Sequence, residues 1–419
     1  MNFVPASPQP GVRHPDWSRH AALYEVNVRQ HSPGGGFDGV TADLPRLAEM
    51  GVGIVWLMPI HPIGALHRKG ALGSYYAVSN HLAVNPEFGT PEDLHRLVSR
   101  AHQLGMKVLL DWVANHTAWD HVWVQQHPEW FRRDAEGRLR SLTFGEGEAL
   151  EEWTDVIGLD YTQRSLWPAM TDAMAHWVRE FDVDGFRCDV AGLVPTPFWN
   201  QARAALDRIK PVFMLAEWSD PALHEQAFDM TYDWALYEVM KRVARGQENV
   251  DALQRLLEQP AQHFPVDAYR MCFTGNHDTN SWHGSDEELY GPAFPAMVVL
   301  AATLYGMPLV YGGQEAPYDK RLRFFERDPI DWKQRALQPL YADLLALKRR
   351  HRALAHGSWG APPRVLPTGH PRVFAFERRL PGDAVTVVLN FSDQPQQVQL
   401  AGRSPRSLAP WGHHIEEET

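Results

Sequence analysis

The chain has 419 residues, 44% hydrophobic and 22% charged, so it can bury a large core and a smaller second one. Its formal net charge of -11 argues against a nucleic-acid partner, and no Lys/Arg-rich tract that would follow phosphates occurs. No apolar run of signal-peptide or membrane-spanning length is present, so we expect a soluble cytoplasmic protein without a membrane partner.

The first half of the chain alternates strand patterns with helix patterns. Residues 23–28 (LYEVNV) and 52–58 (VGIVWLM) are predicted strands, and a helix with Leu44, Leu47 and Ala48 on one face lies between them. The second run is apolar throughout, which is typical of a strand buried on both faces.

The next helix is marked at both ends. Thr90 is the expected N-cap, Pro91 takes the first helical position and Gly105 ends the helix. Residues 106–110 (MKVLL) then form a third predicted strand, which runs directly into Asp111. Between residues 112 and 160 the periodicity fails, and a loop of that length is uncommon unless it is functional or a small subdomain. We therefore interpret 112–160 as a subdomain inserted after the third strand.

Regular alternation resumes after the insertion. Strands are predicted at residues 181–190, 212–216, 228–234, 271–274 and 309–311, and helices around 170–178, 198–209, 236–243, 297–304 and 340–348. Eight strand and helix units over roughly 320 residues match an α/β fold of the (β/α)8 TIM-barrel type with insertions. The barrel domain is predicted to occupy residues 1–350.

The pattern changes beyond residue 350. Strands are predicted at 373–376, 385–390 and 397–400, the first two separated by Pro381 and Gly382. Residues 351–419 are therefore expected to form a C-terminal all-β, sandwich-like domain.

The two cysteines, Cys188 and Cys272, each lie in an apolar strand-like run. This placement predicts buried free thiols rather than a disulfide framework. Neither cysteine has a metal-like spacing with histidine, so a zinc site is not expected.

Polar side chains recur where the predicted strands end, and in a β/α barrel these ends share one face. They are Asp111, Asn115 and His116 after the third strand, Arg187 and Asp189 at the fourth, Glu217 after the fifth, and Asn276, His277 and Asp278 after the seventh. Any one of them is more often a cap or turn residue. Four strands that end this way indicate a shared pocket.

Three converging carboxylates beside an arginine suit the hydrolysis of a glycosidic bond, in which one carboxylate attacks and another donates a proton. Residues two apart on a strand share a face, so Arg187 should keep Asp189 ionised as the nucleophile. A structural ion pair is the alternative for these two residues. Apolar neighbours should raise the pKa of Glu217, as an acid/base requires, and leave Asp278 to bind sugar hydroxyls and stabilise positive charge in the transition state.

Four ordered segments resemble the sequence regions of the α-amylase family of glycoside hydrolases, glycoside hydrolase family 13. They are DWVANH (111–116), GFRCD (185–189), AEW (216–218) and NHD (276–278), and GSYYAVSNHLAVNPEFGT (73–90) resembles the stretch after the family's second strand. The match extends from about residue 23 to about residue 332 in the expected order.

The resemblance implies a retaining α-glucan hydrolase that cleaves α-1,4-glucosidic bonds through a covalent glycosyl-enzyme intermediate. Asp189 would be the nucleophile, Glu217 the acid/base and Asp278 the third carboxylate. The implied substrate-binding residues are Arg187, His116, His277, Tyr76 and Asp111, with Tyr76 stacking on the sugar at the cleavage site. The implied substrate is an α-glucan or maltooligosaccharide, as in starch and carbohydrate metabolism.

The sequence departs from the family pattern at two places. Within three or four residues of Asp189 the family often has Lys or His for the leaving-group sugar, whereas residues 190–193 read VAGL. The insertion ends in GLDY (158–161), where the family usually has Pro-Asp-Leu-Asn. No cofactor is required by this chemistry. Asn115 matches a calcium ligand of some relatives, and the alternative is that it only hydrogen-bonds the insertion.

Two other functions remain open. An α-glucan transglycosylase or a disaccharide-active relative would use the same chemistry, and a non-catalytic glucan-binding protein could share the fold. All three carboxylates are present, which favours an enzyme. The pattern makes no prediction about the oligomeric state.

Overall fold

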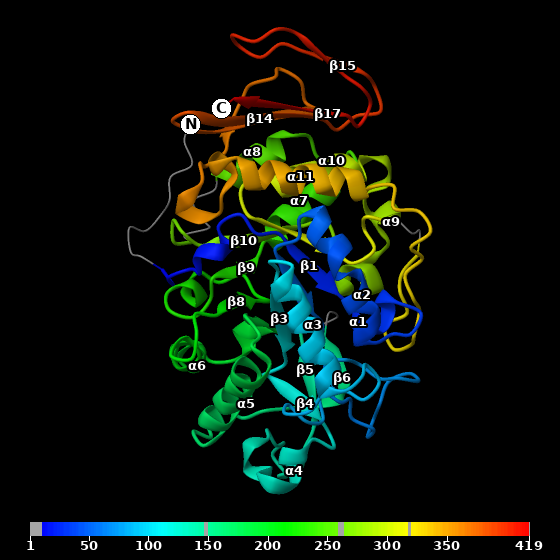
Figure 1. Ribbon diagram of the computed structural model, residues 1–419, viewed down its shortest axis with the longest axis vertical. Helices are drawn as coiled ribbons and strands as arrows, with labels where there is room; N and C mark the ends of the chain where they lie inside the picture. The colour runs from blue at the N-terminus through cyan, green and yellow to red at the C-terminus, as the bar shows by residue number, and fades with distance from the viewer. Residues whose placement is uncertain (1–10, 146–149, 259–263, 317–319, 419) are drawn as a thin grey trace.

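The computed structural model describes residues 11–145, 150–258, 264–316 and 320–418, and eight parallel strands close into a barrel (Figure 1). The barrel strands are β1 (Leu23–Val26), β2 (Ile54–Leu57), β3 (Lys107–Trp112), β7 (Gly185–Cys188), β8 (Phe213–Ala216), β9 (Met230–Tyr232), β10 (Tyr269–Phe273) and β11 (Met307–Tyr311). They pair in the order β1-β11-β10-β9-β8-β7-β3-β2. The expected TIM barrel is therefore confirmed.

Helices surround the barrel and bury the outer faces of its strands (Figure 1). They are α1 (Val28–His31), α2 (Phe37–Met50), α3 (Pro91–Gln103), α5 (Leu166–Phe181), α6 (Thr196–Asp207), α7 (Trp234–Ala244), α8 (Asp251–Glu258), α9 (Asp286–Tyr290), α10 (Phe294–Thr303) and α11 (Gln338–Arg350). The start of α3 carries the expected cap, because Thr90 Oγ1 accepts from the Asp93 amide (3.3 Å) and Asp93 Oδ2 accepts from the Thr90 amide (2.7 Å).

The strand predicted over residues 181–190 is shorter than expected. Phe181 ends helix α5 and Asp182 turns the chain at a φ of 55°, so β7 begins only at Gly185. Gly185 is required there, because a Cβ atom on it would lie 1.9 Å from the carbonyl oxygen of Phe213 in the neighbouring strand.

The insertion after β3 contains regular structure that periodicity did not reveal. Its elements are β4 (His116–Ala118), α4 (Val122–Gln126), β5 (Ser141–Phe144) and β6 (Glu151–Gly158), and the strands form an antiparallel sheet in the order β4-β6-β5. Strand β5 has only four residues (SLTF), and none of its side chains is fully buried, so its short polar and apolar alternation is a weak signal. In Figure 1 the insertion lies at the opposite end of the molecule from the C-terminal strands.

The C-terminal part is all-β, as expected. It consists of a four-stranded sheet and a separate hairpin: β12 (Arg364–Val365), β13 (Val373–Leu380), β14 (Asp383–Asn390) and β17 (His413–Glu418), with β15 (Gln396–Val398) and β16 (Arg406–Leu408). Phe374, Phe376 and Val385 belong to the same hydrophobic cluster as the barrel core. The predicted boundary at residue 351 is therefore not a break in the core.

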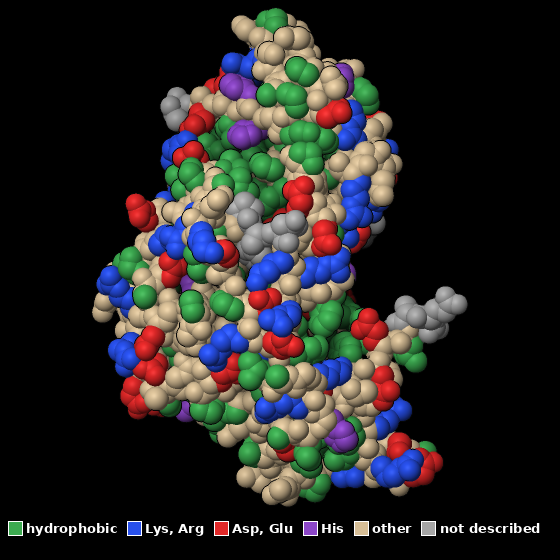
Figure 2. Space-filling model, turned by 90° about the vertical axis from the view of Figure 1, so that its right-hand side faces the viewer, with side chains coloured by type: hydrophobic (Ala, Val, Ile, Leu, Met, Phe, Trp, Pro, Cys, Tyr) green, Lys and Arg blue, Asp and Glu red, His purple; other side chains and the backbone are tan. Residues whose placement is uncertain are grey.

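Both cysteines, Cys188 and Cys272, are buried free thiols, as expected. On the face shown in Figure 2, Lys and Arg side chains are interspersed with Asp and Glu side chains, without one large patch of either sign. Within the described ranges, none of the helices combines the length and the apolar composition needed to cross a lipid bilayer.

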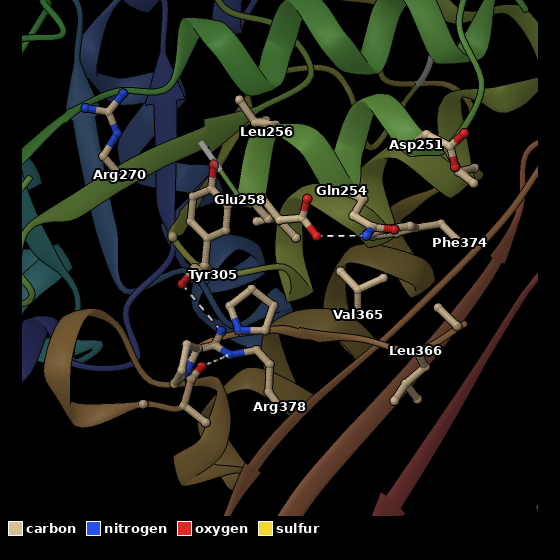
Figure 3. Close-up of a pocket in the computed structure, with 18 of the residues that line it drawn as sticks. Asp251, Gln254, Leu256, Glu258, Arg270, Tyr305, Val365, Leu366, Phe374 and Arg378 are labelled. Atoms are coloured by element: carbon tan, nitrogen blue, oxygen red, sulfur yellow. Dashed lines mark hydrogen bonds between the residues drawn. The ribbon is translucent and has the colours of Figure 1, made fainter. Parts of the chain in front are cut away.

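A cavity of about 1290 Å³ lies between α8 and the C-terminal strands, at the amino ends of β10 and β11 (Figure 3). Arg270, Tyr305, Val365 and Phe374 are among the residues that line it. The side chains predicted to form the functional site do not line this cavity, since they follow the carboxyl ends of the strands.

Candidate active site

The site is built on a buried pair formed by Asp111 and Arg187. The register of β3 and β7 places these residues side by side, and Arg187 Nη1 donates to Asp111 Oδ1 (2.9 Å) and Oδ2 (3.2 Å). Trp56 Nε1 and the Tyr76 hydroxyl also donate to Asp111 Oδ2, each at 3.1 Å. Asp111 thus lies within β3 rather than after it. Its carboxylate holds the Arg187 guanidinium in position through the two hydrogen bonds from Nη1.

The Arg187 guanidinium also joins the two carboxylates that were predicted to be catalytic. Its Nη1 lies 3.2 Å from Asp189 Oδ1, and its Nη2 lies 2.8 Å from Glu217 Oε1. Its Nε donates to the Tyr232 hydroxyl at 3.1 Å. Because one planar group contacts both carboxylates, the structure brings Asp189 and Glu217 together at the ends of neighbouring strands.

The expectation that Glu217 lies in apolar surroundings is wrong. Besides the ion pair with Arg187, its Oε2 accepts the Val190 amide at 2.8 Å. Val190 adopts a left-handed conformation (φ 37°, ψ 47°), which is strained for a β-branched residue and occurs mainly where surrounding structure enforces it. The strained turn aims an amide at the carboxylate, which the apolar neighbours in the sequence could not reveal.

The expectation that Arg187 governs the ionisation of Asp189 also needs correction. Burial and the neighbouring Glu217 carboxylate raise the pKa of Asp189 well above its ordinary value, and Arg187 only partly opposes them. The Asp189 carboxyl therefore retains a proton more readily than an ordinary aspartate does, despite its contact with Arg187.

Asp278 and His277 form the opposite wall of the site. His277 Nε2 lies 3.2 Å from Asp278 Oδ2, and its Nδ1 lies 2.5 Å from Glu25 Oε1. Burial alone would lower the pKa of His277, but Asp278 and Glu25 raise it well above its usual value. The charged imidazolium and Arg187 in turn lower the pKa of Asp278 despite burial. Asp278 is therefore held as a carboxylate in a partly open position.

Tyr76 and His116 complete the predicted set. The Tyr76 ring stacks on His277 with centroids 5.4 Å apart, and its hydroxyl lies 2.8 Å from His277 Nε2. His116 is the first residue of β4, and its Nε2 lies 3.8 Å from Asp189 Oδ2. Burial lowers the pKa of His116 to about 3, so it is a neutral hydrogen-bonding group at neutral pH.

Three further residues of the site were missed from the sequence. Glu25 pairs with His277 from β1, Trp56 donates to Asp111 from β2, and Tyr232 accepts from Arg187 at the end of β9. Glu25 is a charged residue within a strand that is buried throughout, and that pattern was the available signal. Trp56 and Tyr232 carry no such signal, because aromatic residues in strands are ordinary core residues.

Calcium at Asn115 stays a prediction. Its Oδ1 is buried and has no hydrogen-bond partner among the described residues, as an unfilled ligand position would. However, the described part of the chain contains no group of three or more His, Cys, Asp or Glu side chains that could hold a metal ion. The residues present therefore do not supply the carboxylates typical of a calcium site.

Family models match two parts of the chain. The model described as "Alpha amylase, catalytic domain" matches residues 15–136 and 152–336. The model described as "Maltogenic Amylase, C-terminal domain" matches residues 364–412. The first match covers the barrel strands and every residue predicted for the site.

Two curated relatives are similar over most of the chain. An α-amylase, MalA, of Haloarcula japonica is 30% identical over 401 residues, which are 92% of this chain and 57% of that protein. An α-1,4-glucan:maltose-1-phosphate maltosyltransferase of Rhodospirillum rubrum is 29% identical over 347 residues, 75% of this chain and 48% of that protein. The chain thus spans about half the length of these relatives.

Two solved structures are similar over nearly their whole length. An α-amylase from Lactobacillus plantarum is 32% identical with a TM-score of 0.84, and the match covers 96% of this chain and 100% of that one. A maltogenic α-amylase, AmyB, from Thermotoga neapolitana is 31% identical with a TM-score of 0.83, and the match covers 95% and 96% of the two chains.

Proposed function

Because the chain belongs to the α-amylase family of glycoside hydrolases, we propose that it is a retaining hydrolase that cleaves α-1,4-glucosidic bonds in α-glucans or maltooligosaccharides. The observation that carries this proposal is the shared guanidinium of Arg187, which lies 3.2 Å from Asp189 and 2.8 Å from Glu217. A pair of carboxyl groups at one site is what double displacement at an anomeric carbon requires.

In the proposed reaction, Asp189 attacks the anomeric carbon while Glu217 gives a proton to the leaving oxygen. The glycosidic bond breaks, an ester bond forms to Asp189, and Glu217 is left as a carboxylate. Glu217 then removes a proton from water as that water attacks the ester, which frees the sugar and restores both groups. Asp189 must be ionised to attack, and the Arg187 guanidinium 3.2 Å from its Oδ1 favours that form, against burial and the Glu217 carboxylate, which raise the pKa of Asp189.

Asp278, His277 and Tyr76 are proposed to hold the sugar whose anomeric carbon reacts. The carboxylate of Asp278 is partly open and kept ionised by His277, so it can accept hydroxyl hydrogen bonds and favour positive charge at the ring. The Tyr76 ring offers a flat apolar surface beside them.

A transglycosylase is the second candidate, and one feature favours it. Gly192 lies where the family often has a polar acceptor-side residue, and a Cβ atom on it would lie 2.1 Å from the Trp218 ring. An apolar indole beside the cleavage site can stack on an acceptor sugar, and that contact would favour attack by the sugar over attack by water. Chromatography of the products from maltoheptaose separates the two activities, since transfer makes longer oligomers and hydrolysis makes only shorter ones.

Asp189→Asn and Glu217→Gln should each lower turnover of maltoheptaose at least about a thousandfold, because each removes one of the two reacting groups. Circular dichroism should show both variants folded. Asp172→Asn, an exposed carboxylate on α5, is the matched control and should keep wild-type turnover. Wild-type rates in either site variant would contradict the proposal.

A further inference from the structure

Glu25 is a buried carboxylate of the barrel that the proposed reaction does not use. It lies in β1, where the register places it beside Trp56 of β2, and its side chain is fully buried. Its Oε1 lies 2.5 Å from His277 Nδ1, although β11 separates β1 from the strand that precedes His277. Its Oε2 is buried and has no hydrogen-bond partner among the described residues. Burying a carboxylate is costly, so the contact with His277 has to compensate for it.

The hydrogen bonds around His277 fix which of its nitrogens carries a hydrogen. The Tyr76 hydroxyl donates its one hydrogen to Asp111 Oδ2 (3.1 Å), so its oxygen accepts from His277 Nε2 (2.8 Å). Asp278 Oδ2 lies 3.2 Å from the same nitrogen and accepts as well. Nε2 must therefore carry a hydrogen, and the other nitrogen, Nδ1, faces Glu25.

Two proton arrangements satisfy the contact between Glu25 and His277. In one, an ionised Glu25 accepts from an imidazolium, and in the other, a protonated Glu25 donates to Nδ1 of a neutral ring. The carboxylates of Glu25 and Asp278 on opposite sides of the ring favour the first, and they raise the pKa of His277 well above its usual value despite burial. Without Glu25, a neutral ring could place its hydrogen on Nδ1 and present a lone pair to Asp278.

We propose that Glu25 is a positioning residue, which keeps His277 charged and keeps a hydrogen on its Nε2, so that the ring always faces Asp278 and the reacting sugar as a donor. This proposal rests on the proposed function. Loss of the Glu25 charge would let the ring become neutral, and Asp278 would lose the cation that keeps it ionised. A structural ion pair is the alternative, in which Glu25 only anchors the segment after β10.

The charged and titratable groups that face this pair come from several elements. They are Glu25 from β1, Tyr76 from the segment after β2, Asp111 from β3, Arg187 from β7, and Asp278 and His283 from the segment after β10. The carboxylates favour a charged His277 and the Arg187 guanidinium opposes it. Glu25→Gln removes one negative charge and keeps the shape of the side chain, so the pKa of His277 should fall. The ring of the variant should then lose its charge at a lower pH than the ring of wild type.

The test follows the charge of His277 by NMR of ¹⁵N-labelled histidine. The His277 signals are assigned by their absence from the spectrum of His277→Gln. At pH 7 both ring nitrogens should carry hydrogens in wild type, and the titration midpoint should be at least about one pH unit lower in Glu25→Gln. Equal midpoints in the two proteins would overturn the proposal. A neutral ring in wild type at pH 7 would also overturn it, and that result does not depend on the folding of any variant.

Activity should follow the charge of the ring. In Glu25→Gln, kcat/KM for maltoheptaose should fall as the pH rises through the lower His277 midpoint, to at least about tenfold below wild type. Glu315→Gln is the matched control, because Glu315 is also fully buried and accepts from the Tyr24 hydroxyl (2.6 Å) and from Arg46 Nη1 (2.8 Å). It should keep the wild-type His277 midpoint and the wild-type pH profile, even at lower stability. An equal loss in both variants that is constant with pH would mean that Glu25 is only structural.

Failure of the proposed function gives a different result. Wild-type protein would then release no sugar from maltoheptaose at any pH. The ¹⁵N titration still decides the role of Glu25 in that case, because it reports on the ring without turnover. A lower midpoint in Glu25→Gln together with a wild-type midpoint in Glu315→Gln supports the proposal, and equal midpoints in all three proteins overturn it.

Discussion

Arg187 shows how one side chain organises the site. Its guanidinium contacts Asp111, Asp189 and Glu217 and the Tyr232 hydroxyl, and it is completely buried. A buried arginine needs such partners, since an unpaired buried charge is strongly destabilising. Asp111 and Asp189 in turn need the arginine, because burial pushes both of them toward the neutral form. Structure and reactivity therefore depend on the same contacts.

Asp111 offers a pH test at this scale. Burial raises its pKa to about 6 from an ordinary value of 3.8, although Arg187 opposes the shift. A carboxyl whose folded-state pKa is raised binds a proton in the folded state that the unfolded chain has already lost. Its ionisation therefore costs stability as the pH rises from about 4 to 6, by about 3 kcal/mol in total.

Asp111→Asn removes this titration. The change in the thermal midpoint between pH 4.5 and pH 7.5 should be more favourable in the variant than in wild type, whatever its absolute stability. Differential scanning calorimetry at the two pH values measures the change, with Asp172→Asn as the control that should follow wild type. An identical pH dependence in Asp111→Asn and wild type would show that burial does not shift the pKa as described.

The insertion contributes at the scale of elements. It supplies His116 to the site through β4, and it is joined to the loop after β2 by buried histidines. His81 Nδ1 lies 3.0 Å from His121 Nε2, and His81 Nε2 lies 2.8 Å from the carbonyl oxygen of Val113. Trp123 stacks on His81 with centroids 5.2 Å apart. The position of His116 thus depends on the contacts of His81 with His121 and Trp123, and these buried contacts require neutral histidines.

Protonation of His81 at acidic pH should disrupt its contacts with His121 and Trp123 and loosen the insertion. Burial lowers the pKa of His81 to about 4, so below pH 6.5 the unfolded chain binds a proton that the folded chain excludes. Stability is therefore lost as the pH falls from about 6.5 to 4, by about 3 kcal/mol for His81 alone. The protection factors of amides in residues 116–144, which are corrected for the intrinsic pH dependence of hydrogen exchange, should fall between pH 7 and pH 5 more than those in the barrel strands.

His81→Gln is the variant for this test. Glutamine cannot titrate, so the protection factors in the insertion should change less with pH in this variant than in wild type. His95→Gln, on the exposed face of α3, is the control and should leave the wild-type pH dependence in place. Wild-type pH dependence in His81→Gln would rule out this histidine as the cause.

At the scale of the whole molecule, barrel and C-terminal sheet share one core. Phe376 and Leu389 are fully buried in the same cluster as the barrel residues, and Arg378 on β13 donates to the carbonyls of Ala355 (2.8 Å) and Ala361 (2.7 Å). Those donations satisfy backbone groups in the segment that links barrel and sheet. The two parts are therefore expected to unfold together.

Calorimetry should show a single unfolding transition. Phe376→Ala, which empties a fully buried position, should cost about 3–5 kcal/mol and move that whole transition down by several degrees. Phe144→Ala makes the same substitution at a side chain that is 40% exposed and should have little effect. Two separate transitions, with only one of them shifted by Phe376→Ala, would mean that the sheet is an independent unit.

Much of the fold was predictable from local pattern. The run at residues 52–58 and the signals at Thr90 and Pro91 predicted a buried strand and a capped helix, since hydrophobic periodicity and capping act between near neighbours. The insertion was the exception, because β5 has no buried face to mark it.

The sequence by itself determined the barrel and the order of its elements. It also placed the polar residues at the carboxyl ends of the barrel strands, because strand ends and side-chain identity are local properties. Only the tertiary structure decided what those residues meet. The Val190 amide beside Glu217, the Glu25 partner of His277 and the Trp56 donor to Asp111 join segments far apart in the chain. Closure of the barrel sets those distances, and no spacing along the sequence encodes them.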